Sequence, residues 1–191
     1  MEFKTLDELN QYYIKQINSP LAKTATNVVP GAGNPHADIM FIGEAPGKKE
    51  DELGLPFVGP AGKFLDLMLE SINLKREDVY ITNTVKYRPP NNRDPFDDEK
   101  EMFRPWLEAQ IEFINPKIFV PLGRHALWEF LPDLKISENH GKIFYLKKRK
   151  KFVFAMYHPA VALYNGSYRD ILLKDFQNLK KFLDGNYEIK K

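Results

Sequence analysis

The chain has 191 residues, 43% of them hydrophobic and 28% charged, which suits one globular domain (1–191) with a full-sized core. No run approaches the roughly eighteen apolar residues of a membrane span, and the N-terminus lacks the apolar stretch of a secretory signal, so we expect a cytoplasmic protein. A formal net charge of +2 is too small to predict a nucleic-acid partner without a local cluster of basic residues.

The first part of the chain predicts two helices and two strands. Residues 5–18 open with capping-box spacing and continue with apolar residues at helical intervals, which predicts an N-terminal helix. The short apolar runs at 37–43 and 79–85 are typical of buried strands. Between them, residues 62–72 place their apolar side chains on one helical face.

The second part continues the alternation of strands and helices. A helix is expected at 97–114, where acidic residues suit the positive N-terminal end. Further elements follow it: strands at 117–123, 142–148 and 152–158, helices at 124–131 and 168–183, and a charged tail at about 185–191. This alternation predicts an α/β fold with a mainly parallel sheet that is covered on both faces.

Polar, turn-rich segments follow four of the predicted strands. They are GEAPGKKED (43–51), the segment from Asn83 through KYRPPNNRDP, the pair Gly123 and Arg124, and the pair His158 and Pro159. Taken alone, each segment is also explained as an ordinary turn. Because ligands of open α/β sheets bind at the carboxyl ends of the strands, the four together predict a pocket.

The glycine-rich segments do not fit the common nucleotide-binding motifs. GPAGK (59–63) precedes a helix, so its backbone N–H groups could bind a phosphate. It is not a P-loop, because Phe64 stands where Ser or Thr would bind magnesium and Phe57 stands where the first glycine belongs. GEAPG lacks the third glycine of a dinucleotide fingerprint. ATP hydrolysis and NAD chemistry are therefore not expected.

From about Val29 to Leu183 the chain resembles the family 4 uracil-DNA glycosylases. The resemblance is carried by GEAPG-x-x-ED, G-x-PFVG-x-AG, N-x-x-K-x-RPP-x-NR and a late HP, in that order. It implies a three-layer α/β/α sandwich with a central four-stranded, mainly parallel sheet. It also implies hydrolysis of the N-glycosidic bond of deoxyuridine, which leaves an abasic site and free uracil. The implied partner is uracil-containing DNA, single- or double-stranded, and we expect the enzyme to be a monomer.

The resemblance assigns uracil binding to Phe57, Asn83 and His158, with Gly43 and Ala45 beside them. Phe57 would stack on the flipped base, unless it is only a core residue. The Asn83 amide could pair with uracil O4 and N3–H, or it could cap a turn. His158 would donate to O2, where negative charge builds as the glycosidic bond breaks, and its charge state stays open. The other histidines are expected in structural or surface roles: His36, His125 and His140.

Three residues are candidates for activating or positioning the attacking water. Glu50 could polarise water or stabilise the sugar cation, unless it is only a solvated charge within KKEDE (48–52). Asn92 could only position water, and Glu44 could instead hold backbone or uracil. Related family 1 enzymes carry an aspartate where this chain has Ala45. The loop RPPNNRDP lacks the histidine insert with which a related group traps uracil covalently, so covalent trapping is not expected.

Contact with DNA is expected from a wedge and from basic residues. After His158 the chain resembles the family's wedge: Leu163 could fill the space left by the flipped base, and Tyr164 replaces the usual arginine. The remaining candidates for phosphate contact are Gly62, Lys63, Lys86, Arg88, Arg93 and the run Lys147–Lys151, unless that run is a solvated turn.

The chain contains no cysteine, which excludes disulfides, thiolate metal sites and thiol nucleophiles. The resemblance places the four cysteine ligands of the family's iron–sulfur cluster at about Gln16, Ser19, Tyr87 and Phe103. None of these residues is a plausible iron–sulfur ligand, so no cofactor is expected. We hypothesise that Tyr87 and Phe103 join residues near Leu21 in an apolar plug that pins the N-terminal helix.

Two other functions remain open. One is a glycosylase whose preference has shifted to hypoxanthine, xanthine or a 5-substituted uracil. The other is a protein that binds uracil or DNA without turnover. Strand breaks at defined bases in DNA, or binding without breaks, separate these possibilities.

Overall fold

Six strands form one mixed sheet in the order β1-β3-β2-β4-β6-β5 in the computed structural model, which describes residues 2–185. The strands are β1 (Ala32–Gly33), β2 (Ile39–Gly43), β3 (Tyr80–Asn83), β4 (Ile118–Pro121), β5 (Ile143–Leu146) and β6 (Lys151–Phe154). β3, β2, β4 and β6 run parallel, whereas β1 and β5 pair antiparallel at the two edges. The predicted four-stranded parallel sheet is present, and the short strand β1 is an addition that the sequence did not predict.

Eight α-helices are found among the described residues. They are α1 (Leu6–Gln16), α2 (Lys48–Leu53), α3 (Pro60–Glu70), α4 (Asp97–Ile114), α5 (Arg124–Trp128), α6 (Ile136–Asn139), α7 (Val161–Tyr164) and α8 (Ser167–Leu183). Thr5 caps α1 by accepting from the Glu8 N–H at 3.1 Å, and the helix ends two residues before the predicted limit of 5–18. Residues 186–191 of the predicted tail lie outside the described residues. Within residues 2–185, no helix has the length and apolar character needed to cross a membrane.

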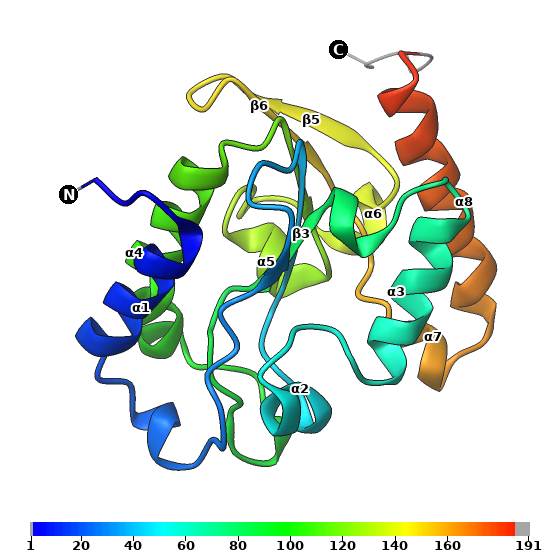
Figure 1. Cartoon of the computed structure of the whole chain (residues 1–191). Coiled ribbons are helices and arrows are strands. Elements are labelled where there is room, and N and C mark those ends of the chain that lie inside the picture. Colours follow the sequence, from blue (N-terminus) through cyan, green and yellow to red (C-terminus); the bar gives the residue numbers. More distant parts are fainter. Residues whose placement is uncertain (1, 186–191) are drawn as a thin grey trace.

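Different helices cover the two faces of the sheet, as Figure 1 shows. Side chains alternate along a strand, so Phe41 of β2 faces the core beneath α3 and α8, whereas Met40 and Ile42 face the core beneath α1, α4 and α5. Phe41 stacks on Phe176 of α8 with ring centroids 6.0 Å apart. The predicted three-layer α/β/α sandwich is confirmed.

The carboxyl ends of the four parallel strands meet at one edge of the sheet. Gly43 ends β2 and is in register with Asn83, the last residue of β3. A bridge between Leu122 and Met156 extends the pairing of β4 and β6 beyond the named strands. The polar segments after these four strands therefore converge, as predicted.

The basic run Lys147–Lys151 lies at the end of the sheet opposite the carboxyl ends of the parallel strands. It includes the turn between β5 and β6, so it precedes the amino end of β6, whereas His158 follows the carboxyl end. Arg149 makes two bonds of 2.7 Å to Glu108. The alternative of a solvated turn fits this run, and its contact with DNA phosphates stays a prediction.

Three of the four positions at which the resemblance places cluster cysteines lie in or against a packed core. Phe103 of α4 is fully buried, its ring centroid lies 5.9 Å from that of Tyr87, and Leu21 belongs to the same apolar cluster. Ser19 Oγ accepts from the Leu21 N–H at 3.2 Å, and Gln16 is exposed at the end of α1. The predicted packing of Tyr87 and Phe103 with Leu21 is confirmed, and these four side chains do not fit an iron–sulfur cluster.

Candidate active site

A pocket of about 310 Å³ opens at the carboxyl edge of the sheet. Its volume lies at the lower end of the range of ligand pockets, about 300–1,000 Å³. The residues predicted to bind uracil or to act in catalysis line it together: Glu44, Ala45, Glu50, Phe57, Asn83, Asn92 and His158. Gly43 lies behind them, where a Cβ would collide with Asn83 Oδ1 and would come within 2.7 Å of the Phe57 ring. The structure therefore brings this predicted set into one place.

A strained turn fixes the ring of Phe57 at the pocket. Its φ is 51°, a left-handed value that a bulky residue rarely adopts. Arg76, paired with Asp66, donates to the Phe57 carbonyl oxygen, and the same oxygen leaves no room for a side chain at Gly62. The ring is buried, and its centroid lies 5.5 Å from that of His158. Phe57 thus belongs to the core and also forms a wall of the pocket.

Asn83 presents an amide oxygen without a partner. Its residue exposure is only 1%, and among the described residues no group hydrogen-bonds Oδ1. Its backbone carbonyl accepts from Lys86 Nζ at 2.7 Å, which fixes the end of β3. An unsatisfied buried acceptor costs about 1–3 kcal/mol, so a donor on a bound ligand would remove that cost.

His158 is held as a neutral donor. The Ala160 N–H donates to Nδ1 at 3.2 Å, so the neutral ring carries its proton on Nε2. Burial lowers the pKa of His158 to about 4, and the charge of Glu50 opposes that shift. Gly123 brings the turn after β4 against this residue, because a Cβ there would lie 3.1 Å from the His158 Cβ.

Glu50 is anchored and is not a solvated charge. Its Oε1 accepts from the N–H groups of Val58 and Gly59, both at 2.8 Å. Glu50 lies on α2, a short helix that the sequence did not predict because KKEDE reads as a charged run. The carboxylate therefore joins α2 to the turn that holds Phe57, and it remains at the pocket wall.

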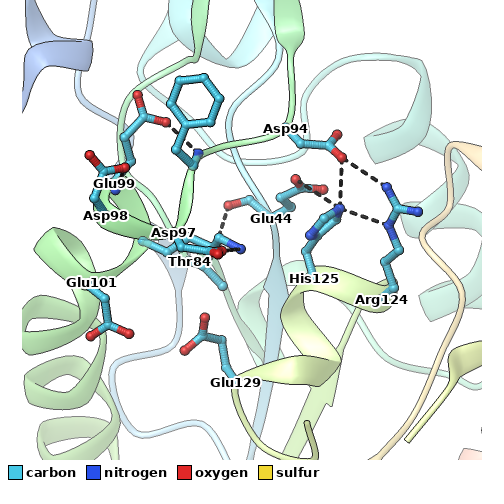
Figure 2. Close-up of polar contacts among 12 residues, drawn as sticks. Glu44, Thr84, Asp94, Asp97, Asp98, Glu99, Glu101, Arg124, His125 and Glu129 are labelled. Atoms are coloured by element: carbon cyan, nitrogen blue, oxygen red, sulfur yellow. Dashed lines mark hydrogen bonds and ion pairs between the residues drawn. The ribbon is translucent and has the colours of Figure 1, made fainter. Parts of the chain in front are cut away.

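Glu44 meets Asp94 and His125 at the rim of the pocket, and Arg124 contacts both of those residues (Figure 2). His125 Nε2 lies 3.6 Å from Glu44 Oε1 and 3.0 Å from Asp94 Oδ2. Arg124 approaches that nitrogen with Nε at 2.9 Å and approaches Asp94 Oδ2 with Nη2 at 3.0 Å. Burial, and then Asp94, raises the pKa of Glu44 to about 7, whereas burial lowers the pKa of His125. Because Arg124 already supplies positive charge to this cluster, we do not assign a metal to it.

His125 and Asp94 were not predicted as site residues. One signal was present in the sequence: Arg124 and His125 directly follow Gly123, at the end of a predicted strand. His125 was expected in a structural or surface role, and its contact with a pocket carboxylate depends on Asp94, thirty-one positions away along the chain. Spacing alone could not reveal that contact.

The predicted phosphate contacts divide into two groups. Lys86 is fully buried, and its Nζ donates to Thr82 Oγ1, Asn83 O and Gln110 Oε1 at 2.7, 2.7 and 2.8 Å. Gly62 is buried beneath Phe57. The prediction of DNA contact is therefore wrong for both Lys86 and Gly62, because packing, and not solvent, surrounds them.

The other predicted DNA contacts lie at or near the surface. Lys63 is exposed, Arg88 Nε donates to Asn92 Oδ1 at 2.7 Å, and Arg93 makes bonds of 2.6 and 2.8 Å to Glu99. Leu163 and Tyr164 on α7 are 49% and 90% exposed, and Tyr164 reaches the pocket rim. These positions remain compatible with the predicted roles.

The fold and the site define an α/β/α protein with a small, polar-lined pocket at the carboxyl edge of its sheet. Residues 30–184 match the model of the uracil-DNA glycosylase superfamily. A type-4 uracil-DNA glycosylase of Saccharolobus solfataricus is 49% identical over 171 residues, covering 85% of this chain and 79% of the relative. Type-4 enzymes of Sulfurisphaera tokodaii and Archaeoglobus fulgidus are each 45% identical, covering 93% and 92% of this chain and 84% and 92% of the relatives. The chain belongs to the uracil-DNA glycosylase superfamily and, within it, to the type-4 family.

Proposed function

We propose that this protein is a uracil-DNA glycosylase, which takes deoxyuridine out of the base stack and hydrolyses its N-glycosidic bond. The observation that carries the proposal is the unpartnered Asn83 Oδ1 in a pocket shared with Phe57 and His158. Family membership supports the same reaction. The products are free uracil and an abasic site.

Uracil recognition follows from the chemistry of the Asn83 amide. Oδ1 would accept from uracil N3–H while Nδ2 donates to O4. Cytosine presents an acceptor at N3 and an amino group at C4. Oδ1 would then face another acceptor and Nδ2 another donor, so cytosine would leave these buried groups unpaired. Phe57 would stack on the ring and contribute to holding the base outside the duplex.

Bond breakage is assigned to electrostatic stabilisation around the base and the sugar. The electron pair of the C1′–N1 bond leaves with uracil, and negative charge builds on O2, where the Nε2–H of His158 would donate. The Glu44 and Glu50 carboxylates would stabilise the positive sugar. Water then bonds to C1′, and Glu44 would accept the proton that the water loses. Asn92 would only help to position that water.

We propose that the reaction proceeds without a metal or cofactor and in a monomer. The absence of cysteine supports the first part, since the chain has no thiolate to hold an iron–sulfur cluster. EDTA should therefore leave the rate unchanged. The apolar packing of Tyr87 against Phe103 takes the place that the resemblance gives to cluster ligands.

The test is base excision from labelled oligonucleotides. Single-stranded and duplex DNA would carry one uracil, hypoxanthine, xanthine or cytosine, and alkali would cleave the abasic product. Breaks at uracil that are lost in Asn83→Ala but retained in His36→Gln, an exposed residue outside the pocket, support the proposal. Breaks only at the other bases would replace it with a shifted preference. DNA binding without breaks would replace it with a non-catalytic role.

A further inference from the structure

We propose that His125 is a positioning residue that shares one proton with Glu44 and so favours the charged form of the Glu44 carboxylate at the rim of the pocket. Its consequence for rate rests on the proposed function, whereas the shared proton itself does not. The two residues come from different segments: Glu44 directly follows β2, and His125 lies in the first turn of α5.

The first observation is the environment of Glu44 Oε1. This oxygen is shielded from solvent and has no hydrogen-bond partner among the described residues. The nitrogen His125 Nε2 lies 3.6 Å away, within the range of an ion pair. A shielded carboxylate oxygen without a donor is costly, and a proton on the facing imidazole would offset that cost.

The second observation is that His125 Nε2 has partners in either protonation state. When it carries a proton, it faces the acceptors Asp94 Oδ2 at 3.0 Å and Glu44 Oε1. When it does not, its lone pair accepts from the Nε–H of Arg124 at 2.9 Å. Figure 2 shows these groups around one imidazole. This nitrogen therefore has a suitable partner in either protonation state.

Burial and the charges around the pair shift the pKa values of Glu44 and His125 toward each other. Burial, followed by Asp94, raises the pKa of Glu44, while Arg124 and Lys100 lower it. Burial lowers the pKa of His125, and Asp94 opposes that shift. Asp97 of α4 also faces the pair, since the charge of His125 contributes to lowering its pKa. The two pKa values therefore move toward each other, and because the facing atoms lie 3.6 Å apart, the two groups should titrate as a coupled pair.

The pair of Glu44 and His125 provides a route by which the proton of the attacking water leaves the pocket. When the water oxygen bonds to C1′, its proton passes to the Glu44 carboxylate, and the proton already on His125 Nε2 leaves through Asp94 Oδ2. The Glu44 proton then takes the vacated position on His125 Nε2. Asp94, which contacts that nitrogen and whose side chain is 59% exposed, leads from the pair to solvent. Uracil leaves as an anion that takes a proton from solvent, so protons and electron pairs balance. Glu44 returns to its charged state for the next turnover.

A titration of the protein without DNA tests the shared proton directly. NMR would follow the His125 ring and the Glu44 carboxyl carbon against pH in the wild type and in Glu44→Gln. The matched control is Glu52→Gln, an exposed glutamate on α2. We expect two-step curves in the wild type and in the control, and a single step for His125 in Glu44→Gln. Identical His125 curves in wild type and Glu44→Gln would overturn the proposal.

A rate profile tests the consequence for catalysis. Without an imidazolium, Glu44 loses its charge at a higher pH, so the acid limb of the single-turnover rate should move upward in His125→Gln. At about pH 6 the rate should fall about tenfold relative to wild type, the effect of a one-unit shift, and at about pH 9 it should be nearly equal. The DNA affinity of His125→Gln should equal that of the wild type, and the control His36→Gln should keep the wild-type rate profile. An unmoved acid limb in a folded His125→Gln protein would contradict the proposal.

The two experiments keep this inference separate from the proposed function. Coupled titrations in a protein that excises no base would retain the shared proton and remove the glycosylase assignment. Excision of uracil by a protein in which Glu44 and His125 titrate independently would support the glycosylase assignment and overturn the shared proton.

Discussion

The imidazole of His158 faces the Ala160 N–H with Nδ1, which leaves Nε2–H as its donor. Replacing His158 with Gln should reduce the single-turnover rate on uracil about 10²- to 10³-fold, the usual effect of removing one donor from a developing oxyanion. Affinity for uracil-containing DNA should change little, because the donor acts mainly as the bond breaks. Rapid-quench kinetics and a binding titration on the same DNA separate the two effects, and a loss confined to binding would contradict the assigned role.

The neutral state of His158 also predicts how stability depends on pH. The folded-state pKa is about 4, whereas an unfolded histidine titrates near 6.5. Between these values the unfolded chain binds the proton and the folded chain does not, so this residue makes the free energy of unfolding fall as the pH drops from about 6.5 to about 4. Urea denaturation across that range should show a shallower fall for His158→Gln. Equal slopes would mean that the folded imidazole is not kept neutral.

Lys86 shows that a sequence motif does not reveal whether a side chain is buried or faces DNA. Its Nζ donates to three acceptors inside the protein, although burial lowers its pKa well below the usual value. Lys86→Met should lower the free energy of unfolding by about 3–5 kcal/mol, because three buried acceptors lose their donor. The salt dependence of DNA binding should stay at the wild-type slope, whereas Lys63→Met, at an exposed position, should make it shallower. A shallower slope for Lys86→Met would restore the phosphate contact that the structure contradicts.

The pocket residues could be predicted from the sequence, whereas the residues that hold them in place could not. Local pattern and the rules of parallel sheets placed Asn83 and His158 at strand ends, and the family resemblance assigned their roles. Their supports, such as Arg76 at the Phe57 turn and His125 beside Glu44, depend on contacts between segments that are distant in the chain. Local periodicity carries no information on such contacts.

The short elements around the pocket are the ones that periodicity could not predict. α4 matches its predicted limits of 97–114, since its eighteen residues repeat the helical pattern several times. α2 and α7 have six and four residues, too few for a repeat to show. They nevertheless carry Glu50 and the predicted wedge, so the elements nearest the chemistry were the least predictable.

The exposed helix α7 should matter most when the base must leave a duplex. Leu163→Ala should lower the excision rate on double-stranded DNA about tenfold and leave single-stranded DNA almost unaffected, because only the duplex requires a wedge to offset unstacking. Leu67→Ala is the matched control: this leucine on α3 is 48% exposed, close to the 49% of Leu163, and does not line the pocket. Equal losses on both substrates would indicate a role other than wedging.

At the scale of the whole molecule, an apolar plug connects the N-terminal helix to the loop that begins at the end of β3. α1 packs on α4, where Tyr13 stacks on Trp106 with centroids 6.1 Å apart and Asn10 accepts from the Trp106 Nε1–H at 2.9 Å. Gln110, which accepts from Lys86, also donates to Asn10 at 2.8 Å. The N-terminal helix is therefore joined to β3, which ends at Asn83, by both apolar and polar contacts.

The double substitution of Tyr87 and Phe103 with Ala tests whether this plug carries the stability of the molecule. Removing a buried phenylalanine ring costs about 3–5 kcal/mol, and a protein of this size loses about 2–4 °C in Tm per kcal/mol. The melting temperature should therefore fall by about 6–20 °C from the loss of the Phe103 ring, and further from the loss of the Tyr87 ring. Tyr145→Ala, which removes an aromatic that is 48% exposed on β5, should change it little. The rate on uracil-containing DNA, measured well below the melting transition, should stay within a few-fold of wild type because neither ring lines the pocket. Melting at the wild-type temperature would show that stability resides elsewhere. A lost rate in a folded double variant would show that the plug also positions the loop that carries Asn92.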